Sequence, residues 1–540
     1  MFDVYLQFNM RRLLQLALAV VLAGCFHAGA QCAFAPMNPR VKLTSTNLPI
    51  VWITVDQEVQ RTERVTARMK IIYNGKGRIN YADTVLHPGQ HVDYEGFVGL
   101  RYRGNSSYNY SAKKPYSFRP LNRPLEDGGS WRRVSLLGMP RDNNWALLAP
   151  YNDKSLMRDI LAFEISRPWM EYTPQGRFCE MICNDVYYGV YLLSEVVSTG
   201  SNRLNLEDPG ESGDELTGGY LMEVDSDDGH SYSSIFLPVR SNGSLINTTH
   251  IYYQYKSPEY QDLTPEQMAY IQDRINKMER SFANYSFRGS KTGECLYIDE
   301  MSFIDYQLAM EIGQNIGAYR LSCKFYKHRD SVDPRFKLVV WDMNFAYGNA
   351  DYQDGYRTDV WAYQRNDILP EKASTNMVPF WWYKLNKEAK YKQHLKERWA
   401  EYRRSNLRID SLMAKIDSLA TVLTAGGAER RNSRAYPVWG IYVWPNYYIA
   451  TDFNDEIAYL KRWLIARILW MDEQLDYVPE LPGGDVNGDG ELGINDVNAL
   501  IFIIGSGSNS TTLRIRADVN GDGEINVNDV NALIDLIMSQ

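Results

Sequence analysis

A short sequence that occurs twice near the end of the chain constrains the fold more than any other feature. Asp-Val-Asn-Gly-Asp-Gly-Glu occupies residues 485–491 and again residues 518–524, and each copy is followed at the same distance by Asn-Asp-Val-Asn-Ala-Leu-Ile. A calcium loop needs oxygen ligands at positions 1, 3 and 5, a glycine at 6, a main-chain carbonyl at 7 and a carboxylate at 12. Both copies meet this requirement.

The predicted calcium ligands occupy equivalent positions in the two loops. They are Asp485, Asn487, Asp489, the carbonyl of Glu491 and Asp496 in the first loop, and Asp518, Asn520, Asp522, the carbonyl of Glu524 and Asp529 in the second. A turn rich in Asp, Asn and Gly that holds no ion would explain one copy. Two matching copies favour Ca²⁺ binding.

A helix is expected after each loop, because apolar residues recur there at helical spacing. Position 12 is Asp instead of Glu, and no helix closely precedes either loop. Over residues 485–538 this arrangement resembles a type I dockerin. The resemblance implies a small all-α, calcium-folded module at 485–540 that docks onto a cohesin-like partner. Residues 477–484, with two prolines and two glycines, are expected to form a linker.

The N-terminal residues 1–30 are typical of a secretory signal peptide. Arg11 and Arg12 precede an apolar run at 13–23 that is too short to span a membrane. Ala28-Gly29-Ala30 suits cleavage before Gln31, whereas Leu22-Ala23-Gly24-Cys25 resembles a lipobox. We therefore expect a secreted or cell-surface bacterial protein, attached to a membrane only if Cys25 is lipidated.

Composition excludes some functions. The net charge of −8 argues against nucleic acid as a main partner. We find no cluster with zinc-ligand spacing and no Gly-x-Ser-x-Gly nucleophile turn. Four cysteines follow the leader region: Cys179, Cys183, Cys295 and Cys323. The spacing of Cys179 and Cys183 would allow a pair only if they were not on one strand, so free buried thiols are the simpler prediction.

The long middle region is expected to begin with strands and to end with helices. Strands are predicted at 50–55, 65–73, 97–103, 186–194, 219–224 and 336–341. Helices are predicted at 155–166, through much of 265–316, and most clearly at 454–475. Strands first and helices later suggest an α+β fold with two lobes.

Six short motifs in this region occur in a characteristic order. They are Arg103-Gly104-Asn105-Ser106-Ser107, Lys113-Lys114-Pro115-Tyr116-Ser117-Phe118, residues 152–158, residues 188–195, residues 218–225 and Trp341-Asp342-Met343-Asn344. The series resembles the spore-coat-H (CotH) kinase family over residues 48–475. We place this domain at 48–476, after an N-terminal linker at 31–47. The resemblance implies an atypical protein-kinase-like fold that binds ATP and a divalent metal such as Mg²⁺.

Phosphoryl transfer relies on positioning and on charge neutralisation. Lys113 or Lys114 could contact the nucleotide phosphates, and the sequence does not decide between them. Asp342, at the end of an apolar strand, could hold the metal as the catalytic carboxylate. On spacing alone, a surface lysine pair and a turn aspartate are the simpler interpretations. The family resemblance favours the metal role for Asp342.

The chain departs from the family's pattern at three positions. The family reads Asn-x-Asp, with a second Asn five residues later; here Asn315 is followed by Gly317 and then Ser322. Asn344 replaces a second aspartate after the tryptophan. Glycine has no side chain that accepts a proton, so kinase activity is uncertain. Two functions remain: an exported kinase-like enzyme acting on protein, and a pseudokinase scaffold displayed through the dockerin. A glycan-associated binding role is a weaker alternative.

Overall fold

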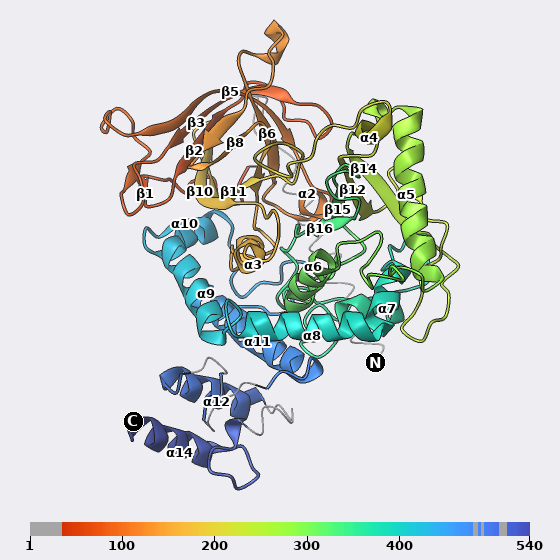
Figure 1. Cartoon of the computed structure of the whole chain (residues 1–540). Coiled ribbons are helices and arrows are strands. Elements are labelled where there is room, and N and C mark those ends of the chain that lie inside the picture. The colour runs from red at the N-terminus through yellow and green to blue at the C-terminus, as the bar shows by residue number, and fades with distance from the viewer. Residues whose placement is uncertain (1–34, 479–483, 488–490, 507–515, 540) are drawn as a thin grey trace, which may run out of the picture.

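The computed structural model describes residues 35–478, 484–487, 491–506 and 516–539. The predicted signal peptide, Cys25 and Asp489 lie outside these residues. Helices make up 32% of the structure and strands 20%, which agrees with an α+β fold. A closed barrel lies beside a five-stranded sheet, and helices cover their lower side (Figure 1).

The barrel follows the strand order β10-β11-β9-β6-β5-β3-β2. Its strands are β2 (Ile50–Thr54), β3 (Val65–Ile72), β5 (Val92–Tyr102), β6 (Tyr116–Leu121), β9 (Trp145–Leu148), β10 (Gly176–Cys183) and β11 (Val186–Glu195). Only β10 and β2 pair in parallel. Side chains alternate along each strand, so Val98, Leu100 and Phe118 fill the barrel core while their neighbours face outward.

The second sheet has the order β13-β14-β12-β15-β16. Its strands are β12 (Tyr220–Asp225), β13 (Tyr232–Ser233), β14 (Tyr252–Ser257), β15 (Cys323–Lys327) and β16 (Lys337–Val339). Two small antiparallel pairs complete the strands. They are β1 (Ser45–Thr46) with β4 (Asn80–Tyr81), and β7 (Val134–Leu136) with β8 (Met139–Asp142).

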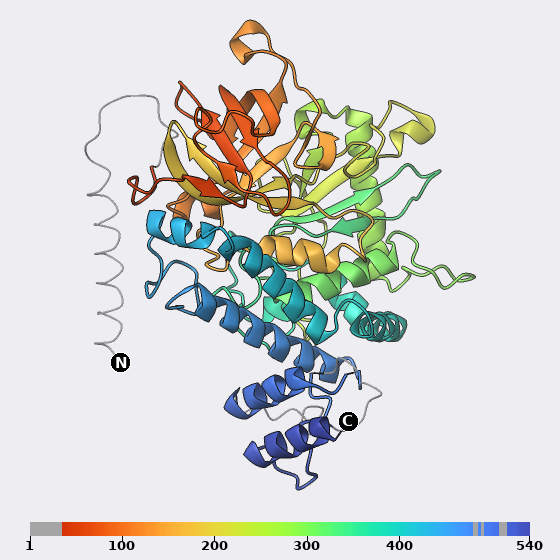
Figure 2. The same ribbon diagram turned by 90° about the vertical axis from the view of Figure 1, so that its left-hand side faces the viewer.

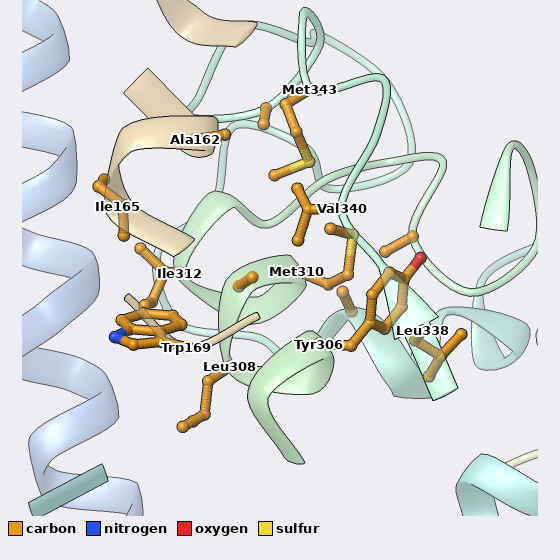
Figure 3. Close-up of a cluster of buried hydrophobic side chains, with 14 of the residues drawn as sticks. Ala162, Ile165, Trp169, Tyr306, Leu308, Met310, Ile312, Leu338, Val340 and Met343 are labelled. Carbon is orange, nitrogen blue, oxygen red and sulfur yellow. The ribbon is translucent and has the colours of Figure 1, made fainter. Parts of the chain in front are cut away.

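Helices α3 and α6 form the centre of the apolar core below the sheets. Tyr306, Leu308, Met310 and Ile312 of α6 (Glu300–Gly313) gather with residues of α3 (Arg158–Ser166) and with the segment that follows β16 (Figure 3). The other short elements are α2 (Ser106–Tyr110), α4 (Gly213–Leu216), η1 (Leu125–Asp127), η2 (Tyr260–Asp262) and η3 (Ala362–Asp367).

Long helices enclose this core. They are α5 (Pro265–Ala283), α7 (Phe380–Lys387), α8 (Ala389–Arg403), α9 (Ile409–Thr424), α10 (Ala428–Ala435) and α11 (Phe453–Gln474). A capping box of Thr264 and Gln267 fixes the start of α5. Buried ion pairs tie α11 to its neighbours: Arg467 lies 3.0 Å from Glu311, and Asp472 lies 2.9 Å from Arg403.

The two C-terminal helices lie beyond α11, at the far end of the molecule from the barrel (Figures 1 and 2). They are α12 (Ile494–Ser506) and α14 (Val527–Met538). Leu500 and Leu533 are fully buried, and Arg516 lies 3.8 Å from Asp472 of α11. In the part of the chain that the structure describes, no helix combines the length and apolar character needed to cross a bilayer.

The cysteine prediction is correct for three residues and wrong for one. Cys179, Cys295 and Cys323 are free and buried, but Cys183 is disulfide-bonded. Cys179 and Cys183 both lie on β10, which explains why they do not pair with each other.

Candidate functional site

A cleft of about 930 Å³ separates the barrel from the five-stranded sheet. Its barrel wall is formed by β5, β6 and the loop before β3, and its opposite wall by β12, β14 and β15. Residues 196–199, which follow β11, and Trp341 also line the cleft. The volume is within the range of ligand sites for nucleotides and other small molecules.

Strand alternation supplies the charged lining of the barrel wall. Leu100 of β5 points into the barrel core, so Arg101 points outward, and Arg103 follows at the end of the strand. Arg119 of β6 pairs with Gly99 in the strand register and therefore faces the same side. Arg61 and Arg64 of the loop before β3 join them.

Positive charge dominates the cleft, although the whole chain has a net charge of −8. Five arginines, Lys256 and Lys324 line it, against three carboxylates: Asp208, Glu259 and Asp262. Glu223 is buried behind the two lysines and lies 2.5 Å from Lys324 and 3.1 Å from Lys256. The site is therefore suited to an anionic ligand.

Asp342 lies in the turn after β16, with a left-handed backbone (φ 60°). The Asn315 side-chain amide donates to the Asp342 carbonyl at 3.0 Å and so holds the turn. The side chain of Asp342 reaches solvent, but the protein packed around its carboxylate raises the pKa. The nearby Arg103 guanidinium and a hydrogen bond from Ser322 act in the opposite direction.

Two further carboxylates adjoin Asp342 that the sequence prediction did not include. Asp225, at the end of β12, accepts a hydrogen bond from the Ser322 main-chain N–H at 2.9 Å. Asp159 of α3 accepts from the Met343 N–H at 2.8 Å, and burial together with Asp342 raises its pKa to about 7. Among the described residues, no three or more His, Cys, Asp or Glu side chains converge as a metal-binding group.

The three positions that depart from the family pattern lie beside this cluster. Ser322 contacts both Asp225 and Asp342, and the main-chain N–H of Gly317 donates to Asn315 Oδ1 at 3.1 Å. The nearest atom to a Cβ built on Gly317 would be Asn315 Oδ1 at 3.6 Å, which is an ordinary contact. Asn344 is half-buried, and its carbonyl accepts from Asn349 at 2.8 Å.

The structure does not place Lys113 and Lys114 in the cleft. Lys113 is buried between β11 and α10; its ammonium donates to the carbonyl of Val190 and to Asn432 Oδ1, the latter at 2.9 Å. Burial lowers its pKa to about 7. The Lys114 ammonium donates to the carbonyl of Tyr108 and lies over its ring. Their predicted phosphate contacts remain a prediction without geometric support, and Arg103 and Lys324 occupy the cleft instead.

The second calcium loop is described completely and has a suitable donor set. Asp529 is fully buried; its carboxylate accepts from the main-chain N–H groups of Val519 and Asn526, both at 2.9 Å. Asp522 accepts from the Glu524 N–H at 2.8 Å. Asp518 Oδ1 is buried, and no donor among the described residues bonds to it. Such an orphaned carboxylate oxygen in a loop of carboxylate and amide oxygens fits a Ca²⁺ ligand.

The first loop repeats this arrangement where it is described. Asp485, Asn487 and Asp496 are buried, and the Asp496 carboxylate accepts from the N–H groups of Asn487 at 3.1 Å and Gly493 at 2.8 Å. The Glu491 side chain is exposed, as expected for a residue that contributes only its carbonyl. Asp489 lies outside the described residues.

Comparison with known proteins identifies two regions. The profile of the CotH kinase protein family matches residues 100–471, and that of the dockerin type I domain matches residues 483–538. A search of curated proteins finds no match. Dockerin type I domains generally bind calcium and cohesins, and they occur in extracellular or cell-surface proteins.

Proposed function

Because the chain belongs to the CotH kinase protein family, we propose that its cleft binds the phosphates of a nucleotide. The barrel and the sheet with its helices would then be the two lobes of a kinase-like domain, joined by segment 196–199. The single observation that carries this proposal is the cationic cleft with Asp342 beside it.

The residues suit phosphate binding in distinct ways. Arg103 and Lys324 would contact phosphate oxygens, because guanidinium and ammonium groups donate charge-assisted hydrogen bonds. Asp342 is the carboxylate that would hold a divalent cation. The Ser322 hydroxyl would be a weaker ligand, and the neighbouring Asp225 carboxylate would supply a further oxygen. When bound, such a cation neutralises developing charge on the transferred group.

A specific observation favours a pseudokinase as the second candidate. Gly317 offers no carboxylate to orient an acceptor hydroxyl. Ser322 offers a hydroxyl where the resemblance implies an asparagine, and Asn344 is neutral where it implies an aspartate. Under this interpretation, the cleft binds its ligand without transferring phosphate. Under the first interpretation, transfer to a protein hydroxyl proceeds slowly. Asp225, which contacts Ser322, would then act as the base.

The termini suggest where the protein acts. We propose that it is exported by residues 1–30 and held outside the cell by Ca²⁺-dependent docking of the dockerin onto a cohesin-like partner. Mass spectrometry of the mature N-terminus tests export. Gln31 indicates a soluble product, an acylated Cys25 indicates a membrane-anchored one, and an intact leader contradicts the proposal.

Calorimetry of ATP binding to the full-length mature protein tests the nucleotide proposal. We expect the affinity for ATP to increase when Mg²⁺ is added. This increase should disappear in the Asp342→Asn variant. Asp417→Asn, an exposed carboxylate change on α9, is the matched control and should behave as wild type. If ATP does not bind with Mg²⁺ present, the proposal is wrong.

A further inference from the structure

The barrel wall of the cleft carries more positive charge than the neighbouring carboxylates neutralise. We define the arginine wall as Arg61, Arg64, Arg101, Arg103 and Arg119. We propose that this wall binds a ligand with two or more phosphate groups directly, so that binding does not require a divalent cation. This inference rests on the proposed phosphate site. It adds that arginine side chains, and not a metal ion, neutralise the negative charge of the ligand.

None of the five arginines forms an ion pair with a carboxylate within the described part of the chain. Main-chain oxygens accept hydrogen bonds from three of them. Arg61 donates to the Gly104 carbonyl at 2.8 Å, Arg64 to the Ser117 carbonyl at 2.9 Å, and Arg101 to the Thr62 carbonyl at 3.2 Å. Because no carboxylate is within ion-pair distance of these guanidinium groups in the described residues, much of their positive charge remains available to a ligand.

Like charges lie close together in the wall, and nearby carboxylates offset them only in part. Burial, followed by repulsion from Arg101 and Arg119, lowers the pKa of Arg64 to about 9. Like charges at close range are unfavourable, and a bound anion would reverse that effect. Proteins rarely keep such a cluster without a ligand or a binding role.

Two donors in the wall have no acceptor. Arg103 Nη1 and Arg119 Nε are buried and make no hydrogen bond to the described protein. Both residues line the cleft. Buried donors without acceptors are unfavourable and usually mark a place that a ligand or ion completes.

Aromatic rings hold the guanidinium groups in place before a ligand arrives. Arg64 and Arg119 lie over Trp131, at 5.9 and 5.4 Å from the ring centroid. Arg103 lies over Trp341 at 5.0 Å. Stacking restrains the planar guanidinium and leaves its edge free to donate to phosphate.

The strand register brings two of these groups together. Gly99 pairs with Arg119, and Arg101 pairs with Ser117, so Arg101 and Arg119 are diagonal neighbours on one face of β5 and β6. Such neighbours have a spacing of roughly 7–8 Å, which two long side chains can close around one phosphate.

The substitutions at the expected metal-ligand and base positions complement this wall. The family's carboxylate and amide positions are Gly317, Ser322 and Asn344 here, and Asp342 is the carboxylate that remains among them. Arginine neutralises phosphate without a metal. The chain therefore combines a reduced set of cation ligands with a cleft wall of five arginines.

Binding of tripolyphosphate and of ATP to the calcium-loaded, desalted full-length protein tests the inference. Each ligand is titrated by calorimetry without added divalent cation and again with Mg²⁺. We expect both to bind without Mg²⁺, with affinity that falls steeply as salt rises, and we expect Mg²⁺ to change the affinity by less than about tenfold.

The variant Arg101→Gln with Arg119→Gln should weaken binding by about tenfold or more. Arg68→Gln removes an arginine from β3 that does not line the cleft, and should have no effect. Circular dichroism confirms folding, and the single Arg119→Gln variant replaces the double one if the latter unfolds. Binding only with Mg²⁺, wild-type affinity in the arginine variant, or insensitivity to salt would overturn the inference.

The outcomes separate this inference from the nucleotide proposal. If ATP binds only with Mg²⁺ and Asp342→Asn abolishes the binding, the nucleotide proposal stands and the arginine inference is wrong. If tripolyphosphate binds without Mg²⁺ and ATP binds no more tightly, the arginine inference stands and free polyphosphate is the better candidate ligand.

Discussion

At the scale of single residues, Gly317 separates the two proposed functions most sharply. The chain lacks a side chain where the family places the aspartate that orients the acceptor. The backbone around Gly317 leaves room for one, since the nearest contact of an added Cβ would be 3.6 Å. The deficiency is therefore chemical and not steric.

Gly317→Asp should raise phosphoryl transfer to a generic protein acceptor by about a hundredfold, because a positioned general base contributes at least that factor. Radiolabel transfer from ATP measures it. Gly317→Asn, which has the same shape and no basic carboxylate, is the matched control and should not raise the rate. An active parent whose rate neither change affects would place the base elsewhere, with Asp225 the next candidate.

At the residue scale, local sequence indicates where a residue lies in its element, but it does not indicate which groups tertiary packing brings together. Asp342 lies beside the cleft because the apolar run at 336–341 becomes β16 and the segment after it. Lys113 and Lys114 lie in a strand-like sequence that suits a phosphate-binding lysine. In the folded barrel, however, the Lys113 side chain points toward α10. The wall arginines are separated by up to 58 positions along the chain, and only closure of the barrel brings them together.

At the scale of elements, the sequence predicted six of the described strands, β2, β3, β5, β11, β12 and β16, and the long helix α11. The helix predicted at 454–475 is α11 at Phe453–Gln474, and the strand predicted at 186–194 is β11 at Val186–Glu195. The strand predicted at 97–103 begins earlier, at Val92, because β5 also pairs with β3 over that stretch. Strand order could not be predicted, since pairing partners leave no trace in local periodicity.

Helix α5 contains a titratable group that makes the stability of its packing depend on pH. Glu279 is fully buried against the sheet and accepts from Ser234 at 2.6 Å and Tyr253 at 2.7 Å. Its second carboxylate oxygen has no hydrogen-bond partner in the described part of the chain. Burial raises the pKa of Glu279 to about 7, so the folded protein favours the neutral acid.

Glu279 has a pKa of 4.5 in the unfolded chain and about 7 in the folded protein. Its protonated form therefore stabilises the fold fully below pH 4.5, and this stabilisation is lost as the pH rises toward about 7. The unfolding temperature of the Glu279→Gln variant should therefore decrease less than that of the wild type as the pH rises from about 4.5 to about 7. Glu266→Gln, an exposed change on the same helix, should follow the wild-type curve. Parallel curves for Glu279→Gln and wild type would contradict the assignment.

At the scale of the whole molecule, a CotH kinase domain is followed by a dockerin type I module, whose folding we expect to depend on Ca²⁺. The sequence of each loop contains three aspartate carboxylates, which would repel one another around an ion site unless a cation neutralised them. Chelation of Ca²⁺ by EDTA should therefore remove the helical signal of α12 and α14 in far-UV circular dichroism and leave that of the remaining helices.

Asp529→Asn should weaken calcium binding and raise the calcium concentration needed for full helicity. Asp535→Asn changes an exposed aspartate of α14 outside the loop and serves as the control. Helicity that is unchanged by EDTA in the wild-type protein would show that the loops fold without the ion.

The central claim is that a phosphate-bearing ligand occupies the cleft between the barrel and the sheet. Hydrogen–deuterium exchange of the full-length protein with and without ATP and Mg²⁺ tests it most directly. The account predicts slower exchange in 99–104, 196–199 and 320–324, which line or adjoin the cleft, and no change in α9. Protection confined to other segments, or no protection under saturating ligand, would contradict it.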